Sequence, residues 1–121
     1  MSSGALAQLC DRHGIDLVVL FGSAVDGADP GDIDLAVAFG RRADKDFLAA
    51  VTDLLALVPG DHLDVLDLDR ADPVGRYAAL TGGRPLFART PADFWERQIF
   101  AINHFIETQP LRDAVLRSLA T

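Results

Sequence analysis

The sequence is poor in cysteine, in basic residues and in long apolar runs. Its single cysteine, Cys10, cannot form an internal disulfide, which is typical of a protein from a reducing cytoplasm. Lys and Arg total 11 against 18 Asp and Glu, for a formal net charge of −7. Proteins whose main task is to bind DNA or RNA need clustered basic side chains. We therefore expect no direct nucleic-acid binding.

The sequence also shows no pattern typical of a membrane-spanning helix or a signal peptide. No apolar run approaches the ~20 residues of a membrane-spanning helix. The opening Met-Ser-Ser-Gly has no basic stretch ahead of an apolar core, so it does not resemble a signal peptide. His13, His62 and His104 are far apart and lack the spacing of zinc ligands. We expect a cytoplasmic protein with no membrane segment, in which these histidines are surface or packing residues.

Half of the 121 residues are hydrophobic, enough for one domain spanning residues 1–121. Its core would cover about residues 5–90, and C-terminal helices about 91–120. Apolar periodicity and boundary residues predict the following elements: helix 5–12, strands 15–21 and 33–39, a helix capped by Asp44 or Asp46, strand 62–68, a helix from Asp72-Pro73 to Gly82, edge strand 84–89, a helix from Pro91 that Pro110 ends, and helix 111–119. This order predicts an α/β (α+β) fold in which helices flank a mixed sheet.

The most informative segment is residues 21–37, FGSAVDGADPGDIDLAV. A buried strand ends in Gly22-Ser23, a loop of turn-forming residues follows, and Asp32 and Asp34 stand two apart in the next apolar run. Side chains at i and i+2 of a strand share one face, so the two carboxylates point the same way. At ~6–7 Å their repulsion costs roughly 2–3 kcal/mol at an effective dielectric constant of about 20. A cation bound between the two carboxylates turns this repulsion into a net attraction, and Mg²⁺ prefers carboxylate oxygen as a ligand.

The Gly22-Ser23 turn offers backbone N–H groups and a hydroxyl, which are the donors that hold a phosphate. A phosphate cradle beside paired carboxylates indicates nucleoside triphosphate chemistry, although either pattern alone is a common turn or surface feature. Nucleotidyl transfer with two metal ions needs a third carboxylate. Asp64 in the third strand is the best candidate, because Asp67 is opposite to it in strand phase and Asp69 lies at the strand end. For the last two we expect solvated positions.

Together, Gly22-Ser23, the loop and Asp32-x-Asp34 resemble the signature of the DNA polymerase β-like nucleotidyltransferases. The short chain is most similar to the minimal nucleotidyltransferase (MNT) antitoxins of HEPN/MNT toxin–antitoxin pairs, over about residues 5–110. The resemblance implies a polymerase β-like nucleotidyltransferase core and an Mg²⁺-dependent protein adenylyltransferase. The triphosphate of ATP would lie on Gly22 and Ser23, and two Mg²⁺ ions on Asp32 and Asp34. Asp64 would complete the metal site and assist deprotonation of the acceptor hydroxyl.

The resemblance also implies a partner. AMP would pass from ATP to a hydroxyl, expected to be that of a Tyr, on a cognate HEPN ribonuclease toxin, and the modification would silence the toxin. Two alternatives stay open. One is a non-catalytic antitoxin that masks its toxin through the C-terminal helices, and the other is a stand-alone small-molecule nucleotidyltransferase acting as a dimer. The chain would therefore form a hetero-oligomer with its toxin or a homo-oligomer.

Three features depart from the family pattern. The loop before the first Asp holds eight residues, Gly31 replaces a Ser, and Asp26 stands where many relatives carry Arg. An acidic residue there gives a triphosphate less electrostatic help. Basic residues after the second strand are candidates to supply the missing positive charge: Arg41, Arg42 and Lys45.

Four aromatic residues lie in the helix that begins at Pro91: Phe94, Trp95, Phe100 and Phe105. We expect most of them to belong to the core. Phe100 lies away from the stripe formed by Ile99, Ile102 and Ile106, so the helix is aromatic on more than one side. Part of it is therefore expected to be a partner surface.

Overall fold

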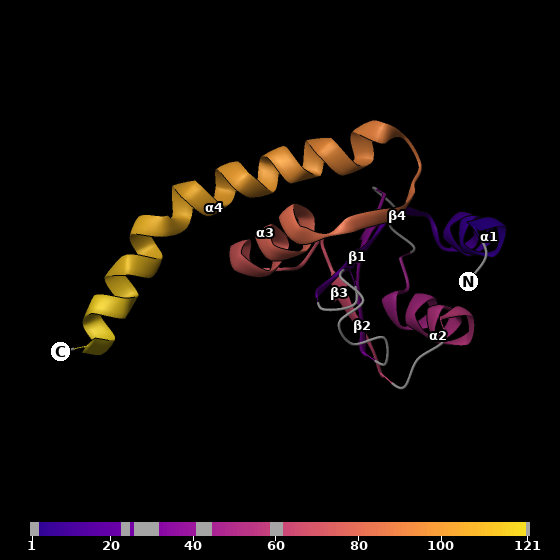
Figure 1. Cartoon of the computed structure of the whole chain (residues 1–121), viewed down its shortest axis with the longest axis horizontal. Coiled ribbons are helices and arrows are strands. Elements are labelled where there is room, and N and C mark those ends of the chain that lie inside the picture. The colour runs from indigo at the N-terminus through magenta and orange to yellow at the C-terminus, as the bar shows by residue number, and fades with distance from the viewer. Residues whose placement is uncertain (1–2, 23–24, 26–31, 41–44, 59–61, 121) are drawn as a thin grey trace.

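Four strands form one mixed sheet in a computed structural model that describes residues 3–22, 25, 32–40, 45–58 and 62–120. They are β1 (Ile15–Phe21), β2 (Asp32–Phe39), β3 (His62–Asp67) and β4 (Arg84–Ala88). The order across the sheet is β3-β2-β1-β4. Figure 1 labels these strands. β1 is antiparallel to β2 and β4, whereas β2 and β3 are parallel. The predicted mixed sheet is confirmed, and β4 takes the edge position to which Pro85 restricts it.

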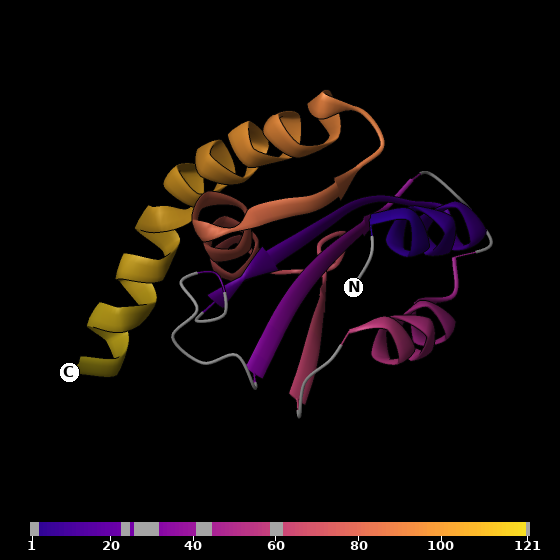
Figure 2. The ribbon, with the colours of Figure 1, turned by 45° about the vertical axis from the view of Figure 1, so that its right-hand side comes forward.

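Helices cover both faces of this sheet (Figure 2). The helices are α1 (Ser3–His13) and α2 (Phe47–Leu57) on one face, and α3 (Pro73–Gly82) and α4 (Pro91–Ala120) on the other. Asp46 caps α2 by accepting a hydrogen bond from the N–H of Ala49, and Asp72 caps α3 through the N–H of Gly75. Asp44, the other candidate for the first cap, lies outside the described residues. Within the described part of the chain, no helix is long and apolar enough to cross a membrane.

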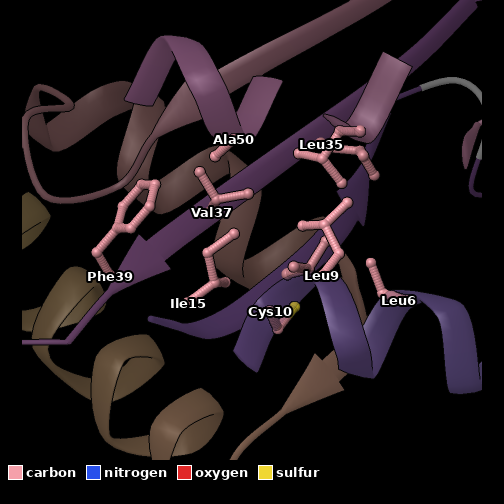
Figure 3. Packing of buried hydrophobic residues seen from close by; sticks show 10 residues of the cluster. Leu6, Leu9, Cys10, Ile15, Leu35, Val37, Phe39 and Ala50 are labelled. Atoms are coloured by element: carbon pink, nitrogen blue, oxygen red, sulfur yellow. The ribbon is translucent and has the colours of Figure 1, made fainter. Parts of the chain in front are cut away.

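Successive side chains of β2 point to opposite faces of the sheet and belong to two different apolar clusters. The cluster under α1 and α2 includes Leu6, Leu9, Cys10, Ile15, Leu35, Val37, Phe39 and Ala50 (Figure 3). On the other face, Ala36 and Ala38 pack beneath α3 and α4. Because the side-chain period of a strand is two, Asp32 and Asp34 continue the row of Ala36 and Ala38. The carboxylates of β2 therefore belong to the sheet face that α3 and α4 cover.

The helix α4 runs unbroken through Pro110. The prediction of two helices separated at Pro110 is therefore wrong. Proline lacks an N–H and crowds the preceding turn, which bends a helix without always ending it. Side-chain donors brace this turn, since Thr108 Oγ1 donates to the carbonyl of His104 at 2.8 Å. Arg112 donates to the carbonyl of Phe105 at 2.7 Å. Figure 1 shows α4 bending in its second half.

Candidate functional site

The strand register brings the three candidate carboxylates to one face of the sheet. Asp34 in β2 pairs directly with Asp64 in β3, and Asp32 pairs with His62. Residues that pair across adjacent strands point to the same side of the sheet. Asp32, Asp34 and Asp64 therefore share the face covered by α3 and α4, at the end where β2 and β3 begin. This arrangement matches the strand phase that the sequence predicts.

The carboxylate of Asp34 also lies against the turn that follows β1. Phe21, the last residue of β1, pairs with Asp34. Gly22 comes next, with a φ of +77° that L side chains rarely adopt. A Cβ on Gly22 would collide with Asp34 Oδ2 and lie 3.3 Å from its Cγ. Glycine is required here on both grounds, and the backbone of the turn approaches the carboxylate closely.

Burial raises the pKa of Asp34 above its ordinary value, and the negative charges of Asp64 and Asp32 raise the pKa further. The site thus concentrates negative charge where β2 and β3 start. A cation between these oxygens would relieve that repulsion. The electrostatics favour a metal-binding role for the three side chains.

The donor set fits Mg²⁺ in kind. Carboxylate oxygens are its preferred protein ligands, and Mg²⁺ usually takes one or two carboxylates and completes its shell with water and substrate phosphates. Among the described residues, no group of three or more His, Cys, Asp or Glu side chains could hold a metal ion by itself. The arrangement therefore fits an ion that arrives with a phosphate ligand better than an ion enclosed by protein alone.

Several residues of the predicted site lie outside the described residues. Ser23 is one of them, so only Gly22 of the predicted phosphate turn is described. Asp26 and the two arginines after β2, Arg41 and Arg42, are outside as well. Their roles remain predictions.

Lys45 does not supply the positive charge for which it was a candidate. Its ammonium donates to Asp67 Oδ2 at 2.6 Å and lies 3.4 Å from Asp69 Oδ2. Asp67 pairs with Val37, whose side chain belongs to the cluster under α1 and α2. Lys45 is therefore held at the far end of the sheet, on the face opposite to the three carboxylates.

The predicted solvated position of Asp67 is wrong. Its side chain is only 11% exposed and is neutralised by Lys45. Asp69 is 37% exposed and accepts a hydrogen bond from the N–H of Phe39 at 3.1 Å. Both carboxylates thus have structural partners at the carboxyl ends of β2 and β3.

One residue at the site, His62, was not singled out for chemistry by sequence reasoning. It is exposed, pairs with Asp32 and lies two residues before Asp64 in the same strand. The signal was its i, i+2 spacing from Asp64, which places both on one face. The isolated position of His62 among the histidines pointed only to a surface role.

A cavity of about 320 Å³ lies at the other end of the same sheet face, lined by Leu68, Asp69, Arg76, Leu80, Arg97 and Phe100. Leu68 comes four residues after Asp64, which corresponds to roughly 13 Å along a strand. This cavity is therefore separate from the carboxylates. The carboxylates lie where β2 and β3 begin, outside this hollow.

The sequence matches the family model described as polymerase beta, nucleotidyltransferase, over residues 5–92. That range includes β1 to β4 and every candidate site residue. Among curated proteins, none matches the sequence.

Solved structures share the fold over nearly the whole chain. A chain of a toxin–antitoxin complex with AMP-PNP is 23% identical, covers 100% of both chains and has a TM-score of 0.80. A chain of the MntA–HepT toxin–antitoxin complex is 24% identical over 98% of this chain and 97% of that chain, with a TM-score of 0.72. A chain of the tri-AMPylated Shewanella oneidensis HEPN toxin in complex with MNT antitoxin is 25% identical over 98% and 96%, with a TM-score of 0.73.

Proposed function

The chain belongs to the polymerase beta nucleotidyltransferase family, and we propose that it is an MNT antitoxin that transfers AMP from ATP to a hydroxyl of a HEPN toxin. The observation that carries the proposal is the register that sets Asp34 opposite Asp64, with Asp32 two residues away. Similar structures hold AMP-PNP in one case and an AMPylated HEPN toxin in another, which supports the choice of nucleotide and acceptor. A Tyr hydroxyl is the acceptor that we expect.

In this proposal each residue has a separate task. The turn at Gly22 and Ser23 presents backbone N–H groups to the phosphates of ATP. Asp32, Asp34 and Asp64 would hold two Mg²⁺ ions together with the phosphates of ATP. The ions would supply positive charge that neutralises the phosphates and lowers the pKa of a coordinated oxygen. Gly22 keeps the turn close to Asp34, so that phosphates and carboxylates meet at one point.

The transfer itself is a displacement at the α-phosphorus. The acceptor oxygen forms a bond to that phosphorus while the bond to the bridging β-phosphate oxygen breaks, and pyrophosphate leaves with the electron pair. Asp64 takes the proton of the acceptor hydroxyl. Asp64 suits this task because it is exposed and lies on β3, an edge strand of the sheet. A protein side chain can therefore approach from that edge.

The exposed apolar residues in the first part of α4 provide a docking surface in this proposal. Trp95, Ile99 and Ile106 are 49%, 51% and 60% exposed, and we call them the upstream stripe. At 100° per residue they lie within about 40° of one another around the helix.

The prediction that most of the four aromatic residues of α4 belong to the core is wrong, because Trp95 and Phe100 are 49% and 57% exposed. Phe94 packs against the core, and Phe105 stacks on Tyr77.

A non-catalytic antitoxin is the competing function, and one observation favours it. Lys45, a candidate source of positive charge for the triphosphate, is engaged with Asp67 at the far end of the sheet. Without that charge a triphosphate gains less stabilisation. Such a protein would silence its toxin by covering it.

Growth of cells that co-express the chain and its partner separates the two functions. We expect the wild type to protect cells, and the paired substitutions Asp32→Asn and Asp34→Asn to abolish protection while leaving the complex intact on co-purification. Leu48→Asn, at a residue that is 75% exposed on α2 and lies outside both the carboxylates and the upstream stripe, serves as the control and should protect. Full protection by the double variant would establish the binding-only function instead.

A further inference from the structure

The cavity at the carboxyl end of β3 contains two arginine side chains, one from α3 and one from α4. Its volume of about 320 Å³ falls at the lower end of the range for small-molecule sites, which is about 300–1,000 Å³. The lining includes the buried Leu68 and Leu80 and the exposed Phe100. Arg76 and Arg97 add two positive charges to this apolar lining. A hollow with apolar walls and a few charged groups is typical of a ligand site.

Arg76 has no ion-pair partner among the described residues. Its Nε donates to the carbonyl of Leu68 at 3.1 Å, and its guanidinium lies 5.8 Å from the centre of the Phe100 ring. The side chain is partly buried, and its two terminal nitrogens have no hydrogen-bond partner in the described part of the chain. Removing a charge from water without a counter-ion is costly. In a chain with 18 acidic and 11 basic residues, this position favours an anion that comes from outside the chain.

Arg97 brings further donors to the same cavity. One of its terminal nitrogens donates to the backbone carbonyl of Asp93 at 3.0 Å and to the carboxylate of Asp93 at 3.1 Å. Within the residues that the structure describes, its Nε and its other terminal nitrogen have no partner. The contacts with Asp93 hold the guanidinium in place. Binding a ligand therefore costs less conformational entropy than it would for a free side chain.

The acidic residues near the cavity are already paired. Asp69 lines the cavity, and its Oδ2 accepts a hydrogen bond from the N–H of Phe39 at 3.1 Å and lies 3.4 Å from the ammonium of Lys45. Asp93 is paired with Arg97. The charge of Arg76 therefore remains in excess at the cavity.

We propose that this cavity binds a small phosphate-bearing molecule, with the guanidinium groups of Arg76 and Arg97 as donors to the phosphate. Guanidinium groups form charge-assisted hydrogen bonds with phosphate and carboxylate oxygens. One guanidinium in bidentate contact occupies both oxygens of a carboxylate, whereas a phosphate keeps further oxygens for a second guanidinium. Two arginines from different helices therefore favour phosphate. Phe100 and the two leucines would contact the organic part of the molecule.

This site is separate from the carboxylates of the proposed transfer reaction. Leu68 comes four residues after Asp64, which is roughly 13 Å along a strand. Asp32, Asp34 and Asp64 do not line the cavity. Binding in the cavity requires no metal ion, because the arginines supply the positive charge. The inference goes beyond the proposed function and does not depend on it.

NMR of the ¹⁵N-labelled full chain, titrated with inorganic phosphate in the presence of EDTA, tests the site. EDTA removes Mg²⁺, so that metal-dependent phosphate binding at the carboxylates does not contribute. We expect the Nε–H signals of Arg76 and Arg97 to shift and to saturate, with a dissociation constant on the order of 1 mM. The backbone N–H signal of Arg117, roughly 25 Å further along α4 than Phe100, should not show a saturable shift. Sodium chloride at equal ionic strength controls for screening.

Substitutions separate a specific site from a general effect of charge. Arg76→Met should weaken phosphate binding about tenfold or more, since hydrogen bonds to charged groups are lost. Arg76→Lys keeps the charge without the planar fork of donors and should also bind more weakly than wild type. Arg117→Met removes the same charge at an exposed residue of α4 and should bind phosphate as wild type does.

The titration of the wild type decides the outcome even if a variant at residue 76 does not fold. Absence of a saturable shift at Arg76 and Arg97 would overturn the proposal. Equal weakening by Arg76→Met and Arg117→Met would also overturn it, because only the net charge would then matter. Acetate that binds as tightly as phosphate would overturn the choice of phosphate and identify a carboxylate site instead.

Discussion

The carboxylate of Asp34 fills the space in which a side chain on Gly22 would begin. This contact joins the two halves of the candidate site, because Gly22 belongs to the turn after β1 and Asp34 to the start of β2. Phe21, the residue before Gly22, pairs with Asp34 in the sheet, and this pairing sets the distance between Gly22 and Asp34. The site is therefore built from the backbone of one strand end and the side chains of the next two strands.

Gly22→Ala should impair both stability and nucleotide binding. The left-handed φ costs about 1–2 kcal/mol for an L residue, and the added methyl displaces Asp34. We expect a loss of this size in the free energy of unfolding, measured by urea denaturation, and weaker Mg²⁺-dependent ATP binding, measured by calorimetry. Gly4→Ala is the control, because nothing lies within 4 Å of its Cβ. Unchanged ATP binding in a folded Gly22→Ala variant would show that this turn does not hold the phosphates.

Removing the ammonium of Lys45 should destabilise the fold without affecting the site. Lys45→Met leaves Asp67, which is 11% exposed, without its partner, at a cost of about 1–3 kcal/mol. Adding Asp67→Asn should recover part of this loss, and a double-mutant cycle on urea denaturation measures the coupling. Arg70→Met is the control, because Arg70 is exposed and lies three residues after Asp67. A large loss of ATP binding in Lys45→Met would restore Lys45 as a residue of the site.

Asp93 should make the stability of α4 depend on pH. Burial alone would raise its pKa, but hydrogen bonds from the N–H and hydroxyl of Thr90 and from Arg97 outweigh burial and hold the pKa below its usual value. A lowered pKa gives stability that is present above the unfolded value of about 3.9 and is lost as the pH falls through the folded value.

Asp93→Asn should therefore lower the free energy of unfolding by about 0.5–2 kcal/mol at neutral pH, which is the range found for the loss of a helix cap. The difference from wild type should shrink as the pH falls. Urea denaturation at several pH values measures the difference from wild type. Glu96→Gln, at an exposed residue, is the control, and its difference from wild type should not change with pH. A difference for Asp93→Asn that stays constant from neutral to acidic pH would exclude the carboxylate as its source.

Strand positions could be predicted from the sequence because apolar runs bounded by Gly and Asp are a local signal. The same holds for the caps at Asp46 and Asp72, and for the shared phase of Asp32 and Asp34. Partners distant in sequence could not be predicted. The sequence predicts a solvated position for Asp67, because its partner Lys45 lies 22 positions earlier in the chain.

Pro110 shows a different limit of sequence reasoning. The helix continues through it, and Thr108 and Arg112 donate to the carbonyls of His104 and Phe105 in the preceding turn. These side-chain contacts are not visible in the pattern of apolar residues from which the helix end was predicted. The pairing of His62 with Asp32 likewise follows from strand register, which the sequence does not specify.

The upstream stripe should matter for the partner and not for the nucleotide. Truncating a large side chain at the centre of an interface can cost 2 kcal/mol or more, which is roughly thirtyfold in affinity. We expect Trp95→Ala to weaken partner binding by about that factor, measured by calorimetry, with unchanged ATP binding. Leu48→Ala, an exposed apolar residue on α2, is the control. Equal partner affinity in both variants would place the docking surface elsewhere, and truncation after Gln109 would test the tail separately.

Intact-mass spectrometry of the partner is the most direct test of the central claim that Asp32, Asp34 and Asp64 carry adenylyl transfer. With ATP and Mg²⁺ we expect the wild type to raise the partner's mass in steps of one AMP unit. Asp32→Asn with Asp34→Asn, or Asp64→Asn alone, should abolish these steps in variants that still fold and still bind the partner. Mass steps that persist in the folded double variant, or a wild type that binds its partner and never modifies it, would contradict the claim.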